Sequence, residues 1–178
     1  MTALATTLVL GGARSGKSAF AERLIADSGL ARIYLATAAA GDDEMKARIA
    51  HHRAQRGEGW TTIEEPLALV DALTREATHG RAVLVDCLTL WLSNLMLAER
   101  DPDIEERRLT RFLGVAKYPV VLVSNELGLG LVPDTPLGRR FRDAQGRLNQ
   151  TVAACVPNVV FIAAGLPLWL KKSSLQES

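Results

Sequence analysis

Hydrophobic runs of strand length recur along the chain, and stretches with helical periodicity separate them. The runs lie at residues 6–10, 32–36, 82–85, 120–124 and 159–163, with a shorter one at 61–63. The helical stretches lie at 18–25, 43–56, 67–78, 90–99, 104–116 and 137–154. Strands that alternate with helices in this way predict an α/β protein with a mainly parallel sheet flanked by helices.

The first hydrophobic run leads into a glycine-rich segment. Residues 11–18 read GGARSGKS and match G-x-x-x-x-G-K-[ST], the pattern of a phosphate-binding loop. In such a loop backbone N–H groups surround phosphate oxygens, Lys17 adds positive charge, and the Ser18 hydroxyl can ligate Mg²⁺. A glycine-rich turn without ligand is disfavoured, because all positions match between a strand and a helix. We therefore predict a nucleoside triphosphate site made by Gly11, Gly12, Ala13, Arg14, Ser15, Gly16, Lys17 and Ser18.

Composition narrows the class of protein. A chain of 178 residues suits one domain, here residues 1–178. The formal net charge of +1 provides no basic field for nucleic acid, and no hydrophobic run reaches the length of a transmembrane helix. Cys87 and Cys155 match no zinc or redox spacing, and two such thiols without a secretory start suggest a reducing cytoplasm. We expect a cytoplasmic protein without a nucleic-acid partner or a transmembrane segment.

A carboxylate ends the hydrophobic run before residue 86. Asp86 follows Val85 directly, and the carboxyl end of a parallel strand opens into the crevice where ligands of α/β sheets bind. If the two strands adjoin, Asp86 lies beside the phosphate-binding loop and can hold Mg²⁺ or its water shell together with Ser18. The alternative is a cap for the helix that follows, because Asp is favoured at helix N-caps.

Two neighbouring histidines lie in the helical stretch 43–56. At about 100° per residue, His52 shares a stripe with Met45 and Ile49, whereas His51 lies among charged residues. The pattern indicates that His52 is packed and that His51 is free to meet a ligand. A neutral imidazole can attack phosphorus and form a phosphoramidate, although an exposed histidine is more often only a surface residue.

Longer motifs resemble those of a known family. They are YLAT at 34–37, DDEMKARIAHH at 42–52, WTTIEEP at 60–66, VDCLTLWLSN at 85–94, SNELGLGLVP at 124–133, GRRFRD at 138–143, GRLNQ at 146–150 and AGLPLWLK at 164–171. With the phosphate-binding loop they resemble the bifunctional adenosylcobinamide kinase/adenosylcobinamide-phosphate guanylyltransferases of cobalamin synthesis. The poorest match is the segment 97–116, and the tail 172–178 is uninformative.

The resemblance implies two reactions on a P-loop NTPase fold that is RecA-like and assembles as a homotrimer. In the first reaction the hydroxyl of the aminopropanol arm of adenosylcobinamide attacks the γ-phosphate of ATP or GTP. In the second, a histidine takes GMP from GTP, releases pyrophosphate, and passes GMP to adenosylcobinamide phosphate. His51 matches that histidine, in agreement with the helical pattern. His52 and Arg53 are grouped with the nucleotide-binding residues, where Arg53 could offset phosphate charge.

Further nucleotide contacts are expected at two strand ends. A carboxylate can accept from both guanine N–H donors, and Glu64 matches a residue that the family associates with the nucleotide. A solvated loop acid is the alternative for Glu64. Thr37, Ala38 and Ala39 end the second run and would lie at the same crevice edge, where backbone contacts to nucleotide are expected.

The segment after the run 120–124 also opens into the crevice. Asn125 and Glu126 come first, and the glycines and prolines that follow suit a loop that closes over substrate. On the next helix Arg142, Arg147, Asn149 and Gln150 serve either the structure or a subunit interface, and the pattern does not decide between the two.

Three other classes of protein share parts of this pattern. A monofunctional small-molecule kinase needs Lys17, Ser18 and Asp86 but has no use for His51. A recombinase-like, DNA-stimulated ATPase shares the fold but should carry a basic stripe, which this sequence lacks. A nucleotide-sensing protein would keep the loop without turnover.

Overall fold

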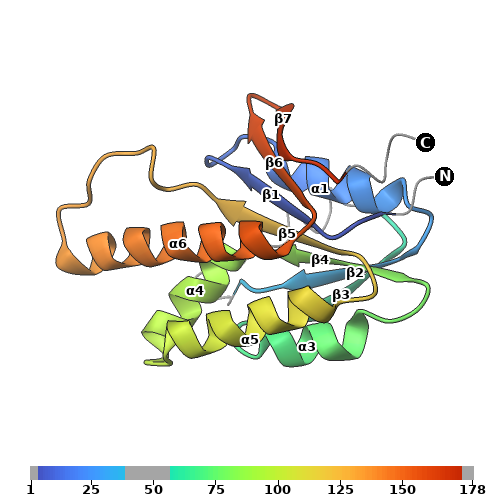
Figure 1. Ribbon diagram of the computed structural model, residues 1–178, viewed down its shortest axis with the longest axis horizontal. Coiled ribbons are helices and arrows are strands. Elements are labelled where there is room, and N and C mark those ends of the chain that lie inside the picture. Colours follow the sequence, from blue (N-terminus) through green and yellow to red (C-terminus); the bar gives the residue numbers. More distant parts are fainter. Residues whose placement is uncertain (1–3, 39–56, 174–178) are drawn as a thin grey trace.

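The protein is built around one seven-stranded sheet (Figure 1), which the computed structural model describes for residues 4–38 and 57–173. The strands are β1 (Thr7–Gly11), β2 (Ala31–Ala36), β3 (Trp60–Glu64), β4 (Arg81–Asp86), β5 (Val120–Asn125), β6 (Asn158–Ala163) and β7 (Leu166–Lys171). Their order across the sheet is β3-β2-β4-β5-β1-β6-β7, and only β7 is antiparallel to its neighbour. The predicted mainly parallel sheet is confirmed.

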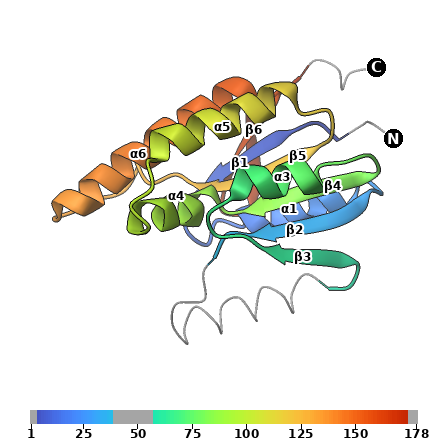
Figure 2. The ribbon, with the colours of Figure 1, turned by 90° about the horizontal axis from the view of Figure 1, so that it is seen from below.

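Helices cover both faces of this sheet. Those in the described residues are α1 (Lys17–Ala26), α3 (Leu69–Glu76), α4 (Leu88–Leu97), α5 (Pro102–Val115) and α6 (Pro136–Cys155). Helix α1 packs on one face, whereas α3, α4, α5 and α6 gather over the other (Figures 1 and 2). Alternate residues of β1 follow this division, since Leu8 and Leu10 face the larger group of helices and Val9 faces α1. Strands buried on both sides read as continuous hydrophobic runs, which is why the sequence pattern located them.

Side-chain caps start two of the long helices. The Asp101 carboxylate accepts a hydrogen bond from the backbone N–H of Asp103, and the Thr135 hydroxyl accepts one from Gly138. A proline follows each cap, and proline is well suited to the first helical position because its missing N–H has no helical partner there. The first turns of α6 extend past the carboxyl ends of the strands (Figures 1 and 2).

The order of strands answers the question of whether the strands before the phosphate-binding loop and before Asp86 adjoin. Strand β5 lies between β1 and β4, so the strand that leads to the phosphate-binding loop does not adjoin the strand that ends in Asp86. Helix α4 also has Cys87 rather than Asp86 at its N-cap position. Among the described helices, none has the length and hydrophobicity needed to cross a membrane.

Candidate nucleotide-binding site

The phosphate-binding loop connects β1 to α1 at the carboxyl edge of the sheet. Gly16 holds the N-cap position of α1 with φ of 94°, a left-handed conformation that favours glycine. At Gly11 a Cβ atom would lie 2.5 Å from the Ser15 Oγ and 2.6 Å from the backbone oxygen of Ile162, so only glycine fits. No side chain caps α1, and its first N–H groups are therefore available to an anion.

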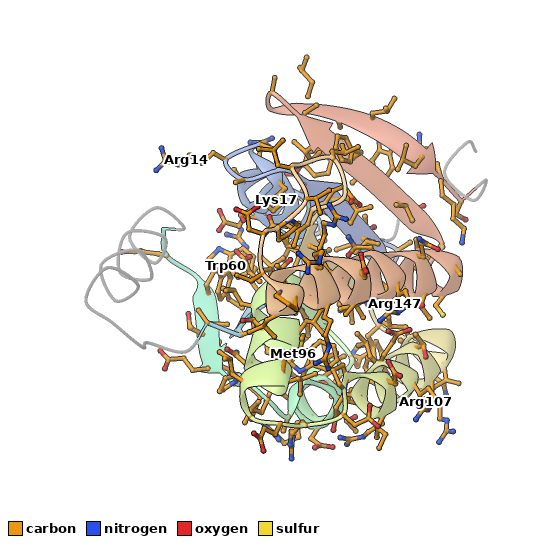
Figure 3. The ribbon with its side chains drawn as sticks, turned by 90° about the vertical axis from the view of Figure 1, so that its left-hand side faces the viewer. Arg14, Lys17, Trp60, Met96, Arg107 and Arg147 are labelled. Carbon is orange, nitrogen blue, oxygen red and sulfur yellow. The ribbon has the colours of Figure 1, made fainter. Side chains whose placement is uncertain are left out.

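Contacts within and around the loop hold its shape. The Lys17 ammonium donates to the backbone oxygen of Gly12 at 3.0 Å, which places the charge over the loop. In the turn between β6 and β7, the backbone N–H of Gly165 donates to the backbone oxygen of Ser15 at 2.8 Å. Figure 3 shows Lys17 at the start of α1 and Arg14 extending outward from the same loop. The loop is thus braced by the hairpin at the sheet edge.

Asp86 is oriented by a tyrosine from the neighbouring strand. The Tyr34 hydroxyl donates to Asp86 Oδ2 at 2.9 Å, and the Tyr34 ring meets the edge of Trp60 at a centroid distance of 6.1 Å. Tyr34 is itself buried, with 6% of its surface exposed. One carboxylate oxygen is therefore fixed, which sets the direction in which the other can bind a ligand. Tyr34 cannot be assigned this role from the sequence pattern, because its partner lies 52 residues away.

Thr37 connects the ends of β2 and β4. Its hydroxyl donates to the backbone oxygen of Cys87 at 2.7 Å and accepts from the Cys87 N–H at 2.8 Å. The Asn94 amide donates to the Thr37 backbone oxygen at 2.7 Å and to that of Pro66 at 3.1 Å. These bonds fix the backbone that follows Asp86. The predicted contact between Thr37 and a nucleotide stays a prediction.

The pKa of the Cys87 thiol depends on two charged residues of the site, Asp86 and Lys17. Burial and the Asp86 carboxylate raise its pKa, and the Lys17 ammonium lowers it, so that the resulting pKa is about 11. Both charges therefore act on the same thiol. They do so although the strands that lead to Lys17 and Asp86 do not adjoin.

A buried network of side chains joins the end of β5 to α6. The Ser124 hydroxyl donates to Asn149 Oδ1 at 2.7 Å, and Gln145 Nε2 donates to both of these oxygens at 2.9 Å. Ser124 and Gln145 are completely buried, and Asn149 is 4% exposed. These hydrogen bonds fix the helix against the sheet, while Gln145 Oε1 has no hydrogen-bond partner among the described residues.

Glu126 lies between this network and the phosphate-binding loop. Its N–H donates to the backbone oxygen of Gly11 at 3.1 Å. Its carboxylate accepts from the Gly128 N–H at 2.8 Å and from Asn149 Nδ2 at 3.5 Å. Asn149 Nδ2 also donates to the Asn125 backbone oxygen at 3.0 Å. These bonds hold Asn125 and Glu126 at the end of β5, next to the phosphate-binding loop.

The remaining residues of the predicted nucleotide site lie at the ends of β2 and β3 or outside the described residues. Glu64 is exposed at the end of β3, in register with Ala36 of β2, and Ala38 is half-buried beyond the end of β2. The neighbouring Glu65 instead accepts from the N–H groups of Leu67 and Ala68 before α3. Four predicted site residues lie outside the described residues: Ala39, His51, His52 and Arg53.

A glycine-rich loop between a strand and a helix, with an acidic residue beyond an inserted strand, defines a P-loop NTPase with a RecA-like fold. The crystal structure of the RadB recombinase matches this fold with a TM-score of 0.51 at 15% identity, over 88% of this chain and 73% of that chain. The chain belongs to the cobinamide kinase / cobinamide phosphate guanyltransferase family, whose model matches residues 7–170. This confirms the resemblance seen in the sequence motifs.

Two named relatives extend the similarity to nearly the whole chain. The bifunctional adenosylcobalamin biosynthesis protein CobP of Pseudomonas aeruginosa is 55% identical over 171 residues, which cover 94% of this chain and 98% of that protein. The bifunctional adenosylcobalamin biosynthesis protein CobU of Escherichia coli is 39% identical, over 92% of this chain and 98% of that protein.

Proposed function

We propose that this protein phosphorylates adenosylcobinamide with ATP or GTP and then transfers GMP from GTP to adenosylcobinamide phosphate. The observation that carries this proposal is the joint presence of a complete phosphate-binding loop and a family match over residues 7–170. The relatives are named bifunctional, which favours two activities over a kinase alone.

In the kinase step, charge around the phosphates stabilises the transition state. Lys17 and the first N–H groups of α1 would neutralise the outer phosphates of the nucleotide. The Ser18 hydroxyl and the Asp86 carboxylate are hard oxygen donors, and this donor chemistry suits Mg²⁺. The described residues contain no group of three His, Cys, Asp or Glu side chains that could hold a metal, so phosphate and water would complete its coordination. Bound Mg²⁺ would supply positive charge to the phosphate oxygens.

In the second reaction, His51 is the proposed nucleophile. Its imidazole nitrogen attacks the α-phosphorus of GTP, the bond to the β-phosphate oxygen breaks, and pyrophosphate leaves. An oxygen of adenosylcobinamide phosphate then attacks the same phosphorus and frees the histidine. Arg53 would balance the charge of the attacked phosphate, His52 would contribute to the same nucleotide site, and Glu64 would bind guanine. The support for these roles is the match of the sequence motifs.

Exposed hydrophobic side chains support the proposed homotrimer. Leu166 and Leu168 on β7 are 71% and 61% exposed, and Leu129 and Leu131 after β5 are 81% and 95% exposed. Hydrophobic surface of this kind marks interaction sites. Sedimentation of Leu168→Glu beside the unchanged protein tests this interface, and an unchanged trimer in the variant would exclude β7. A cytoplasmic location belongs to the same proposal.

Labelled GTP tests the two-step reaction directly. The protein is incubated with Mg²⁺ and GTP labelled on either the α- or the γ-phosphate. We expect only the α-label to stay on the protein, in a phosphoramidate that alkali preserves and acid cleaves. His51→Ala should lose the label but retain phosphorylation of adenosylcobinamide, because that step needs no covalent intermediate. Retention of acid-labile label by His51→Ala would place the nucleophile elsewhere, and γ-transfer to the corrinoid with no adduct would indicate a monofunctional kinase.

A further inference from the structure

A cavity of about 660 Å³ lies between α6 and the hairpin of β6 and β7. Its walls include Glu126, Arg142, Arg147, Gln150, Leu170 and Lys171. The part of α6 that borders it runs from residue 142 to residue 153, roughly 16 Å along the helix axis. This volume lies within the range of small-molecule sites, about 300 to 1,000 Å³.

A lysine that borders this cavity already has hydrogen-bond partners in the protein. Lys171 Nζ donates to the backbone oxygens of Ala153 and Ala154 at 3.2 and 3.3 Å. These bonds satisfy carbonyl groups in the last turn of α6, so the charge of Lys171 stabilises the helix end. A ligand charge therefore has to be met by the other cationic side chains of the cavity.

Two arginines supply positive charge nearer the start of α6. Arg142 Nε lies 3.9 Å from Asp143 Oδ1, which is too long for a hydrogen bond. Arg147 borders the cavity about one and a half turns further along the helix, and Figure 3 shows it on α6. Guanidinium groups bind phosphate oxygens in a bidentate geometry.

A carboxylate lies where the cavity meets the phosphate-binding loop. Glu126 borders the cavity, and its backbone N–H is bonded to the first residue of the loop, Gly11. The bonds from Gly128 and Asn149 hold its two carboxylate oxygens in one orientation. An ionised carboxylate only accepts hydrogen bonds, so Glu126 can face a hydroxyl group.

We propose that this cavity is the acceptor site, in which Glu126 faces the hydroxyl to be phosphorylated and Arg142 and Arg147 face the phosphate that results. The ligand class is an alcohol on a short arm of a large polar molecule, and its phosphomonoester. This inference rests on the proposed function and adds the place and the proton acceptor of its first step.

The proposed step conserves atoms and charge. The hydroxyl oxygen forms a bond to the γ-phosphorus, and its proton passes to the Glu126 carboxylate. The bond between the γ-phosphorus and its bridging oxygen breaks, and the nucleoside diphosphate leaves with that electron pair. Leu170 and Val159 contact the apolar part of the arm, whereas a large ring system stays outside, because only the arm fits this volume.

Glu126→Gln tests the proton acceptor, because it keeps the size and removes the negative charge. We expect the kcat of adenosylcobinamide phosphorylation to fall about 100-fold or more, with no recovery at saturating corrinoid. The GMP adduct formed from GTP alone should be unchanged, because no acceptor takes part in it. Glu106→Gln on α5 is the matched control and should retain both activities. Kinase turnover near that of the control, or equal loss of the adduct, would overturn the role of Glu126.

Arg142→Gln tests the phosphate contact independently. We expect the KM for adenosylcobinamide phosphate in guanylyl transfer to rise about tenfold while adduct formation stays normal. Arg107→Gln on α5 is the control for the lost charge. An unchanged KM with a folded variant would overturn the placement of the phosphate in this cavity. Absence of the adduct in the unchanged protein would instead contradict the proposed guanylyl transfer.

Discussion

The phosphate-binding loop and the junction of β5 with α6 lie side by side at the carboxyl edge of the sheet, but they are built in different ways. The loop binds through its backbone and depends on glycines within eight residues of sequence. The junction depends on side chains, and its Ser124 and Asn149 are 25 residues apart. The comparison shows that a local sequence motif can define where a nucleotide binds, whereas residues that are distant in the sequence define the side chains next to that site.

Removing the loop lysine should have the largest effect. Lys17→Ala removes the charge that stabilises the outer phosphates in both reactions, so we expect each rate to fall about 100-fold or more. Initial rates of corrinoid phosphorylation and of GMP adduct formation measure this. Lys117→Ala removes an exposed lysine elsewhere and should change neither. Near-normal kinase turnover in Lys17→Ala would refute the assignment of the loop.

Substitution of Asp86 tests whether turnover depends on the negative charge at the end of β4 or only on the shape of this side chain. Asp86→Asn should abolish most Mg²⁺-dependent turnover with little change in thermal stability, because Cys87 and not Asp86 occupies the N-cap of α4. Tyr34→Phe should reduce turnover less, roughly tenfold, since it removes one hydrogen bond to a charged group. For both variants we would measure the turnover rate at several Mg²⁺ concentrations and, separately, the unfolding temperature, which distinguishes a loss of activity from a loss of stability. Equal losses in both variants would assign the effect to Tyr34.

The side-chain junction should respond in stability as well as in rate. Asn149→Ala leaves Ser124 and Gln145 without their shared acceptor, and we expect about 2 kcal/mol of destabilisation, or roughly 4 to 8 °C in Tm. Because Asn149 positions Glu126, the kinase rate should also fall, while the GMP adduct should form normally. Arg140→Ala, an exposed change on the same helix, is the control. A drop in both activities in parallel with stability would indicate a structural role alone.

The smallest effect concerns the thiols at neutral pH. An alkylating reagent should modify exposed Cys155 and not buried Cys87, which mass spectrometry of the intact protein detects.

The folded pKa of Cys87 is about 11, above its ordinary value of 9.0, so its contribution to stability is complete below pH 9 and is lost as pH rises toward 11. Urea unfolding should show this loss, and Cys87→Ala should lack it. An identical pH dependence in Cys87→Ala would assign the loss to other groups.

Much of the fold was predictable because buried parallel strands carry continuous hydrophobic runs. β7 was missed, since Pro167 weakens a strand prediction and the residues of this strand are exposed at the sheet edge. Whether β1 and β4 adjoin stayed open at the level of the sequence, because no local pattern encodes the order of strands, and β5 in fact lies between them. In the site, the loop geometry followed from its motif. Tyr34 and Gln145 could not be assigned from sequence, since each acquires its role from a partner in another element.

The bond between Gly165 and Ser15 has a consequence for the order of assembly. The loop is synthesised early, but the turn that braces it follows six of the seven strands. Contacts between such distant segments form late and slow the folding of a chain. A nascent chain that lacks the last hairpin therefore carries the whole motif without its support. We therefore expect a chain that ends before this hairpin to bind nucleotide more weakly, because its loop lacks the bond from Gly165.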